Sequence, residues 1–334
     1  MRAIRRQTYI EHCQHHYVPL HLQPWWLDAV CTDGAWDVAL ATQGKGRVTG
    51  VMPYYQTRRL GLPVILPAPF APYGGPWLHY PSDVDFRQSS RYSFEQKTMT
   101  ALIQQLPSAA FFLQNFHPDI INCLPFHHAG YRQTVRYTFI FEKIEDENLV
   151  FQQFKNPLRL KLQKADRATE VLRDDAAAAL VLHLHALSFQ RKNLRKPRHT
   201  AAFLSLDHQL RVRGQSAVFI ARDRINGLPH AGLYLSFDER RASTFLAGFD
   251  PAYGAHCALY GLYRAAICFC AERGLGLDFE GSMDAGIEQV FRSFGGRLTP
   301  YFQVWRAGNQ LLEAAYCLGG FDRGGRSGRR RTRT

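Results

Sequence analysis

The sequence predicts an α/β protein with mixed sheets, arranged as two similar lobes in tandem. Segments with helical periodicity alternate with segments typical of strands. The chain has 334 residues, which exceeds the size at which a single hydrophobic core usually stops growing. The order of elements in the first half also recurs in the second half. Each lobe is therefore expected to be a mixed sheet with helices on its faces.

The composition is that of a folded globular chain. Hydrophobic residues make up 46% and charged residues 21%, which excludes a disordered, collagen-like or disulfide-stapled protein. The seven cysteines form no CxxC pair, so free thiols in a reducing compartment are expected. The N-terminus lacks the apolar core of a signal peptide, and no apolar stretch is long enough to span a membrane. We therefore expect a cytoplasmic protein without a membrane span.

The first half is expected to run helix, strand, strand, loop, helix, strand, strand. A proline at its start favours a helix at Pro24–Cys31, and glycines at 44 and 46 favour a hairpin turn. The prolines in Val64–Leu78 exclude a central strand and indicate a strand end followed by a structured loop. The other expected elements are strands Trp36–Ala41, Arg47–Thr57, Phe111–Asn115 and Tyr131–Phe141, and helix Phe94–Leu106.

The second half repeats this order. Four pairs of corresponding strands begin at residues 36 and 216, 47 and 230, 111 and 275, and 131 and 298. This near-constant spacing indicates a duplication, although the residues themselves are barely similar between the halves. The expected elements are helices Asp174–Phe189, His199–Arg213 and Gly254–Arg273, and strands Ser216–Arg222, His230–Phe237, Arg241–Phe249, Leu275–Glu280 and Leu298–Trp305.

A basic connector, residues 146–173, separates the two halves. Apolar residues recur along it at helical spacing, and basic residues share the stretch: Phe151, Phe154, Leu158 and Leu162, with Lys155, Arg159, Lys161, Lys164 and Arg167. Two interpretations stay open, a surface helix with a solvated basic face and a site that binds an anion. We predict a first lobe at 1–145, a second lobe at 174–320 and a disordered arginine-rich tail at 321–334.

The formal net charge of +13 favours an anionic partner. The tail contributes +5 and the remainder of the chain +8. Arginine-rich tails of this kind bind nucleic-acid phosphates non-specifically, so a non-catalytic nucleic-acid-binding protein is one candidate class. No helix-turn-helix, zinc-finger or RNP-type motif accompanies the tail in the sequence.

Two histidines near the N-terminus share one face of an expected helix. His12 and His16 stand four residues apart, but two ligands do not make a structural metal site. A solvated helix face is the simpler interpretation, and no metal is expected.

The segment LDFEGSMDAGIEQVFRSFGGRLTPYFQV, residues 277–304, resembles the signature of an acetyltransferase-like family in the GNAT superfamily. That superfamily includes the Fem-type peptidoglycan aminoacyltransferases, which have a duplicated GNAT fold. The resemblance covers roughly residues 20–310 and is most specific at Glu280–Met283. Further stretches that look similar are QPWWLDAVC (23–31), GVMPYY (50–55), PYGGPW (72–77), LQNFHPDI (113–120), PLRLKLQKADR (157–167), FQRKNLRKP (189–197) and LAGFDPAYGAHCALY (246–260).

The resemblance implies two GNAT-like lobes with a cleft between them. It also implies transfer of an acyl group from a carrier to an amine, either on a small molecule or on a peptidoglycan precursor. The carrier it implies is acyl-CoA, with aminoacyl-tRNA as the alternative in the Fem-type branch. The long helical arm of many peptidoglycan-bridging members is not evident in this sequence.

Transfer to an amine needs a group that takes up the amine proton. Glu280 is the first candidate because it follows an apolar strand and emerges at the strand end. Asp278 points the same way by two-residue alternation, and Ser282 is expected to cap a helix at Met283–Phe294. The alternative is that these three residues only cap and brace the turn.

GNAT enzymes usually hold the CoA pyrophosphate on a Gly/Arg-rich loop before a helix. The matching loop here, FDPAYGAHC at 249–257, lacks the R-x-x-G-x-G/A run. Asp250 is expected to cap the following helix, and an acid at that position repels a pyrophosphate. This departure favours carrier recognition by the basic connector. The carrier-binding candidates are Arg159 and Lys164 first, then Arg191, with Tyr253 and Gly254 in the loop.

The acceptor candidates lie in the first half. Tyr73, Gly74 and Gly75 form a loop whose glycines allow close backbone approach. Similar loops border the acceptor cleft in the family that this sequence resembles, as does the strand end at Asn115 and His117. The alternative is a structural turn, since a lone histidine is more often a satisfied hydrogen-bonding group than a catalyst.

Overall fold

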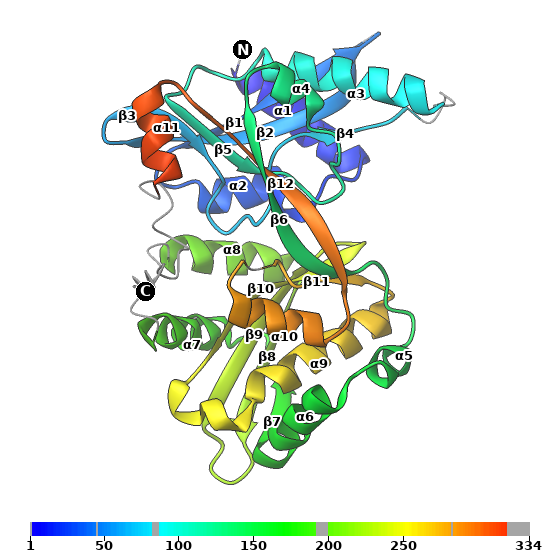
Figure 1. Cartoon of the computed structure of the whole chain (residues 1–334), viewed down its shortest axis with the longest axis vertical. Helices are drawn as coiled ribbons and strands as arrows, with labels where there is room; N and C mark the ends of the chain where they lie inside the picture. Colours follow the sequence, from blue (N-terminus) through cyan, green and yellow to red (C-terminus); the bar gives the residue numbers. More distant parts are fainter. Residues whose placement is uncertain (1, 45, 82–86, 192–199, 282, 319–334) are drawn as a thin grey trace, which may run out of the picture. The chain divides into compact units, whose positions relative to one another are not determined.

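A computed structural model of the chain describes residues 2–44, 46–81, 87–191, 200–281 and 283–318 (Figure 1). The chain divides into two compact units. Among the described residues, the first unit comprises residues 2–136 and 300–318, and the second comprises residues 137–299. The tail predicted at 321–334 lies outside the described residues.

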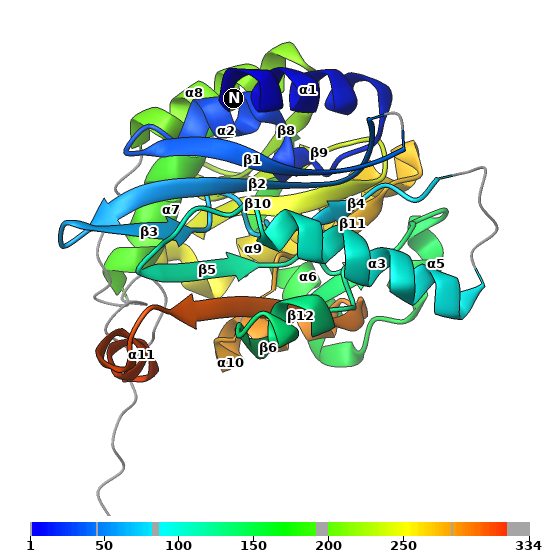
Figure 2. The same cartoon turned by 90° about the horizontal axis from the view of Figure 1, so that it is seen from above.

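The first unit is a mixed sheet with helices packed against it. Its strands are β1 (Ala35–Gln43), β2 (Arg47–Arg59), β3 (Leu62–Leu66), β4 (Trp77–Leu78), β5 (Phe111–Asn115) and most of β12 (Arg297–Ala307). Its helices are α1 (Arg2–His15), η1 (Leu20–Leu22), α2 (Pro24–Val30), α3 (Gln88–Ile103), α4 (Leu124–His128) and α11 (Gln310–Cys317). Figure 2 shows the order β1-β2-β3-β5-β12, and β4 pairs with β2. Helix α1 packs on β1, and α3 packs on β1 and β2.

The second unit is also a mixed sheet. Its strands are the second half of β6 (Arg132–Phe141), β7 (Thr169–Arg173), β8 (Ser216–Asp223), β9 (Pro229–Phe237), β10 (Arg241–Phe249) and β11 (Gly276–Asp278), in the order β6-β11-β10-β9-β8-β7. Its helices are α5 (Glu147–Gln152), α6 (Asn156–Ala168), α7 (Ala178–Arg191), α8 (Thr200–Val212), η2 (Pro251–His256), α9 (Ala258–Arg273) and α10 (Ala285–Ser293). Helix α9 packs on β8, β9 and β10.

The two sheets repeat one pattern of pairing. In the first unit β1, β2 and β3 form an antiparallel meander, β3 pairs with β5 in parallel, and β12 closes the sheet antiparallel to β5. In the second unit β8, β9 and β10 form the meander, β10 pairs with β11 in parallel, and β6 closes the sheet antiparallel to β11. The duplication inferred from strand spacing is therefore present as two tandem α/β sheets.

The closing strand of each sheet comes from the other half of the sequence. β6 ends the first half of the chain, but Ile140 and Phe141 pair with β11 of the second unit. β12 ends the second half, but its residues from Gln303 onward pair with β5 of the first unit. The unit boundaries consequently fall inside these two strands, at residues 136/137 and 299/300.

These boundaries differ from the predicted lobes at 1–145 and 174–320. The predicted connector, 146–173, is part of the second unit. Phe154, Leu158 and Leu162 of its apolar stripe are buried in the same core as α9 and β9. The apolar stripe was predicted correctly, whereas the end of the connector, Thr169–Arg173, is an edge strand that helical spacing did not reveal.

Most predicted helices and strands are present, with ends that shift by a few residues. The helix predicted from Gly254 is an exception, because η2 comes first and α9 starts only at Ala258. Cys257 separates the two in a left-handed conformation, with φ of 58°. Helices α4 and α11 were not predicted at all. All seven cysteines are free thiols, as expected.

No helix in the described part of the chain is long and apolar enough to cross a membrane.

Candidate active site

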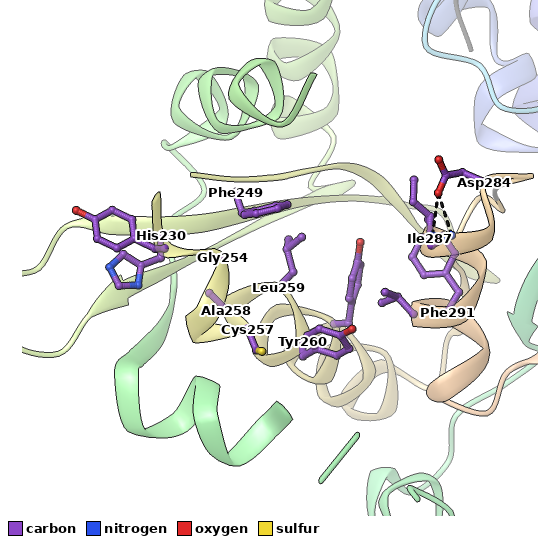
Figure 3. A pocket seen from close by; sticks show the side chains of 14 residues that line it. His230, Phe249, Gly254, Cys257, Ala258, Leu259, Tyr260, Asp284, Ile287 and Phe291 are labelled. Atoms are coloured by element: carbon purple, nitrogen blue, oxygen red, sulfur yellow. Dashed lines mark hydrogen bonds between the residues drawn. The ribbon is translucent and has the colours of Figure 1, made fainter. Parts of the chain in front are cut away.

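A cavity of about 460 Å³ lies in the second unit beside the N-terminus of α9 (Figure 3). Its walls come from the end of β10, the loop that contains η2, the first turns of α9, and α10. The apolar part of the wall consists of Leu259, Tyr260 and Tyr263 from α9, and Ile287, Val290 and Phe291 from α10. Burial raises the pKa of Tyr263, so its phenol is neutral at physiological pH. The cavity therefore suits a largely uncharged group.

Local sequence chemistry shapes the loop at one side of this cavity. Asp250 accepts a hydrogen bond from the backbone N–H of Ala252, and Pro251 occupies the first position of η2. The predicted cap at Asp250 is thus confirmed, although it caps η2 and not the long helix. A Cβ atom at Gly254 would meet Phe249 at an ordinary 3.5 Å, so the fold itself does not require glycine there.

Tyr253 and Gly254, two of the predicted carrier-binding residues, do line the cavity. The Tyr253 ring stacks on the imidazole of His230, with centroids 3.9 Å apart and planes 16° from parallel. His230 is fully buried and also lines the cavity. This end is therefore more polar than the wall formed by α9 and α10.

Glu280 lies two residues beyond the end of β11 and has a left-handed backbone, with φ of 56°. Gly281 follows with the same φ, and a Cβ atom there would lie 2.2 Å from the carbonyl oxygen of Tyr137 on β6. The Glu-Gly pair is thus shaped by the close passage of β6. Burial and the neighbouring charge of Asp278 raise the pKa of Glu280 to about 8, although a hydrogen bond with Ser243 lowers it.

Asp278 braces this turn. Its side chain is only 1% exposed, and Oδ1 accepts hydrogen bonds from the Thr138 hydroxyl at 2.6 Å and the Glu280 N–H at 2.8 Å. The two acids are therefore close together, as alternation predicted, but they differ in environment. Asp278 holds the backbone of Glu280, which favours a positioning role over direct contact with a substrate.

Glu280 is not among the residues that line the cavity. Phe279, which precedes it, packs against two residues of the cavity wall, with ring centroids 5.7 Å from Tyr263 and 5.0 Å from Phe291. One layer of aromatic side chains thus connects the cavity wall to the strand end that carries Glu280.

The predicted cap at Ser282 is wrong. Asp284 caps α10, because its carboxylate accepts hydrogen bonds from the backbone N–H groups of Gly286 and Ile287 (Figure 3). An aspartate fits this role as well as a serine does, and the helix begins at Ala285. Ser282 itself lies outside the described residues.

The structure separates the basic residues of the connector by what they contact. The Arg159 guanidinium donates to the backbone carbonyls of Phe151, Gln152 and Phe154, so it holds the end of α5. Lys164 is exposed. Lys161, which was not among the candidates, donates to the hydroxyl of Tyr260 at 2.7 Å. The side chain of Arg191 lies outside the described residues.

Lys161 could have been found from the sequence. It lies three residues after Leu158 and one before Leu162, at the edge of the apolar stripe of α6. A lysine at such an edge faces the element that the stripe packs against, which here is α9. The basic residues on the opposite face of α6 face solvent.

The acceptor candidates of the first unit lie close together around the end of β5. The Tyr73 ring meets the His117 ring at 5.5 Å, and the Gly74 N–H donates to the carbonyl of Asn115 at 2.6 Å. A Cβ atom at Gly74 or Gly75 would lie 2.3 Å from Gln114 or Phe116, respectively. Gly75 is thus required by its φ of 83° and by the rigid Phe116 ring, whereas a Cβ atom at Gly74 would be too close only to the end of the Gln114 side chain. Packing inside the unit agrees with a structural turn.

Comparison with known proteins finds a family model that is similar to much of the second unit. Residues 152–290 match the family model described as an acetyltransferase (GNAT) domain. A comparison with curated proteins gave no match.

Many solved structures match this chain, and two of them illustrate a similarity over nearly its whole length. FemX is 13% identical, with a TM-score of 0.64 over 94% of this chain and 98% of its own. A conserved protein of unknown function from Bacteroides thetaiotaomicron is 12% identical, with a TM-score of 0.52 over 92% of this chain and 98% of its own.

The segment 152–290 is therefore similar to GNAT acetyltransferase domains, and the chemistry that this match supports is acyl transfer in general. The chain as a whole has a GNAT-like fold similar to that of FemX, as the resemblance at Leu277–Val304 implied.

Proposed function

We propose that this protein is an N-acyltransferase that moves an acyl group from acyl-CoA to an amine, with Glu280 as the general base. The observation that carries the proposal is the environment of Glu280. The carboxyl group sits at a strand end within a GNAT domain, and its pKa is raised to about 8. A base works best when its pKa lies near the operating pH, because it is then both available and strong enough to take a proton.

The reaction that follows is balanced without a metal or redox partner. The amine nitrogen forms a C–N bond with the carbonyl carbon of the thioester, and the C–S bond breaks. The carboxylate of Glu280 takes the proton that the amine loses, and the CoA sulfur leaves as a thiolate. That proton then passes from Glu280 to the thiolate, which gives the CoA thiol and restores the carboxylate. Asp278 contributes by fixing the Glu280 backbone through the hydrogen bond at 2.8 Å.

We propose that the cavity beside α9 holds the apolar part of the carrier. Its volume of about 460 Å³ and its aromatic wall support binding of an extended, mostly uncharged arm. Lys161 is the basic residue that we assign to the carrier, since it contacts Tyr260 of that wall. Arg159 and Lys164 make no comparable contact, and the cap at Asp250 still disfavours a pyrophosphate at η2.

The acceptor is proposed only as a class, an amine, with peptidoglycan-precursor amines included because of the fold shared with FemX. Tyr73, Asn115 and His117 stay acceptor candidates of the first unit. Tyr73 and His117 are 4% and 8% exposed, which gives them little surface for direct contact in this conformation.

The test is acyl-CoA-dependent acylation of a panel of amines, followed by release of the CoA thiol. Glu280→Gln should lower kcat by about 100-fold or more and leave the KM for acyl-CoA nearly unchanged. Glu288→Gln is the matched control, since Glu288 pairs with Arg292 on the surface of α10. Full turnover by Glu280→Gln would remove Glu280 from the mechanism.

The same assay distinguishes acyl-CoA from aminoacyl-tRNA as the acyl donor. Transfer that is lost after nuclease treatment and does not respond to acyl-CoA would replace acyl-CoA by aminoacyl-tRNA. Retention on nucleic acid without any acyl transfer would instead favour a binding protein, and the arginine-rich tail would be the first segment to delete.

A further inference from the structure

Three side chains beside the cavity have the donor set of a transition-metal site. They are Asp223 at the end of β8, His230 on β9 and His256 at the end of η2. One carboxylate oxygen and one ring nitrogen from each histidine lie within 4.8 Å of one another. In the described part of the chain this is the one such cluster of three potential ligands.

The fold holds the first two ligands firmly. β8 and β9 form a hairpin in which Arg222 pairs with Pro229, so Asp223 and His230 meet where the hairpin turn begins. Asp223 Oδ1 accepts hydrogen bonds from the N–H groups of Ile225 and Asn226, at 2.8 and 3.1 Å. These bonds orient the second oxygen, Oδ2, which lies 3.2 Å from His230 Nε2. A ligand held by such outer hydrogen bonds is typical of protein metal sites.

The surroundings of His230 Nε2 are a second, independent indication of a metal site. The side chain is fully buried, and Nε2 makes no hydrogen bond although Asp223 Oδ2 is 3.2 Å away. The oxygen must therefore lie off the direction in which an Nε2–H group would point. This arrangement is poor for an aspartate–histidine proton relay. It is the one that two ligands of a single cation adopt, because tetrahedral ligands with bonds of about 2.1 Å lie about 3.4 Å from each other.

His256, at the end of η2, is the third potential ligand. Its Nδ1 lies 3.2 Å from Nδ1 of His230, and its side chain is half-buried at the end of a short helix. The Tyr253 ring covers His230 and fixes the plane of that imidazole. Rotation of the His256 side chain is thus the adjustment needed to bring one nitrogen within bonding distance of a shared ion.

We propose that Asp223, His230 and His256 bind a divalent transition metal such as zinc. Two imidazoles and one carboxylate suit Zn²⁺ and similar first-row ions, and they leave room for a fourth ligand. His230 also lines the cavity, so a molecule bound there can supply that ligand. This site lies outside the base proposed at Glu280, and metal binding is measured without any acyl transfer.

The experiment uses the full-length protein stripped with EDTA, dialysed, and titrated with Zn²⁺ against a chromophoric chelator. We expect one Zn²⁺ per chain, a rise in melting temperature on addition of Zn²⁺, and visible absorption typical of tetrahedral coordination when Co²⁺ replaces it. His256→Ala should weaken Zn²⁺ binding by more than about 100-fold, the upper range for loss of an outer partner.

Two further variants keep the test decisive if one protein folds poorly. Asp223→Asn retains an oxygen for the Ile225 and Asn226 N–H groups but removes the charge, and it should also weaken Zn²⁺ binding. His208→Ala removes an exposed histidine of α8 and should change nothing. Equal Zn²⁺ affinity in His256→Ala and His208→Ala, or no stoichiometric binding by the wild-type protein, would overturn the proposal.

A histidine cluster in the first unit provides the remaining control. His16 lies with its ring centroid 4.6 Å from that of His12 and 4.0 Å from that of His79. Loss of Zn²⁺ binding in His16→Ala, with no loss in His256→Ala, would place the ion there and contradict the assignment to Asp223, His230 and His256.

Discussion

Glu280 combines two costly features at one residue. A left-handed backbone disfavours residues other than glycine, and burial of a carboxyl group beside Asp278 disfavours its charged form. Both features follow from the way β11 ends. The hydrogen bond from the Glu280 N–H to Asp278 and the close passage of β6 at Gly281 together hold the turn. Such strain persists only where the surroundings enforce it, which is common at functional sites.

The raised pKa of Glu280 predicts how stability depends on pH. The folded protein keeps this proton up to a pH of about 8, whereas the unfolded chain loses it near the ordinary value of 4.5. Between pH 5 and 8 unfolding therefore releases a proton, and the contribution of Glu280 to stability is lost as the pH rises. The free energy of unfolding of the wild type should fall relative to Glu280→Gln by up to about 1.4 kcal/mol per pH unit.

Urea unfolding at several pH values measures this difference. Glu288→Gln provides the baseline for removing a surface glutamate from α10. If the free energies of unfolding of the wild type and of Glu280→Gln change in parallel from pH 5 to 8, the raised pKa of Glu280 is contradicted.

At the scale of elements, the packing of α6 against α9 gives Lys161 a contact that the other lysine of α6, Lys164, does not make. Lys161 donates to Tyr260 and lies 4.6 Å from the centre of its ring, whereas Lys164 is exposed. Helical spacing predicted the buried stripe of α6 correctly. The position of Lys161 at the edge of that stripe also indicates the lysine that faces the packing partner of α6. That this partner is α9, about 100 residues away, depends on the fold.

This difference predicts unequal effects on carrier binding. Lys161→Met should weaken the binding of acyl-CoA by about tenfold or more, since a hydrogen bond from a charged group contributes roughly 1.5–3 kcal/mol. Lys164→Met, the matched control on the same helix, should change it less than twofold. Titration calorimetry with a non-hydrolysable acyl-CoA analogue measures both, and a larger loss for Lys164→Met would contradict the assignment.

At the scale of the whole molecule, the exchange of closing strands explains what sequence patterns could and could not show. Strand spacing revealed the duplication, because each half carries the same elements in the same order. The pairing partners of β6 and β12 could not be predicted from the sequence. By its hydrophobic pattern alone, an antiparallel closing strand fits either β5 or β11. The candidate site shows the same limit. Glu280 was found from a strand end, but its left-handed backbone and the cap at Asp284 depend on long-range packing.

The exchange predicts that a residue near the C-terminal end of β12 stabilises the first unit. Trp305 is buried beside Phe111 and Tyr316 in a cluster of that unit. Trp305→Ala should destabilise the protein by about 3–5 kcal/mol. In hydrogen exchange, peptides from β5 should lose more protection than peptides from β9.

Leu298→Ala is the control, because Leu298 lies on the same strand, within the second unit, and is 53% exposed. Loss of protection confined to the second unit in Trp305→Ala would contradict the assignment of this part of β12.

The pH dependence of kcat/KM for acyl transfer tests the role of Glu280 most directly. The wild-type rate should rise about tenfold per pH unit below pH 8 and level off above it, because only the carboxylate takes up the amine proton. Glu280→Gln should lose most of its activity and no longer show this rise of kcat/KM with pH. Glu288→Gln should keep the activity and the rise. A wild-type profile that is flat from pH 6.5 to 9, or the same rise in Glu280→Gln, would contradict the proposed mechanism.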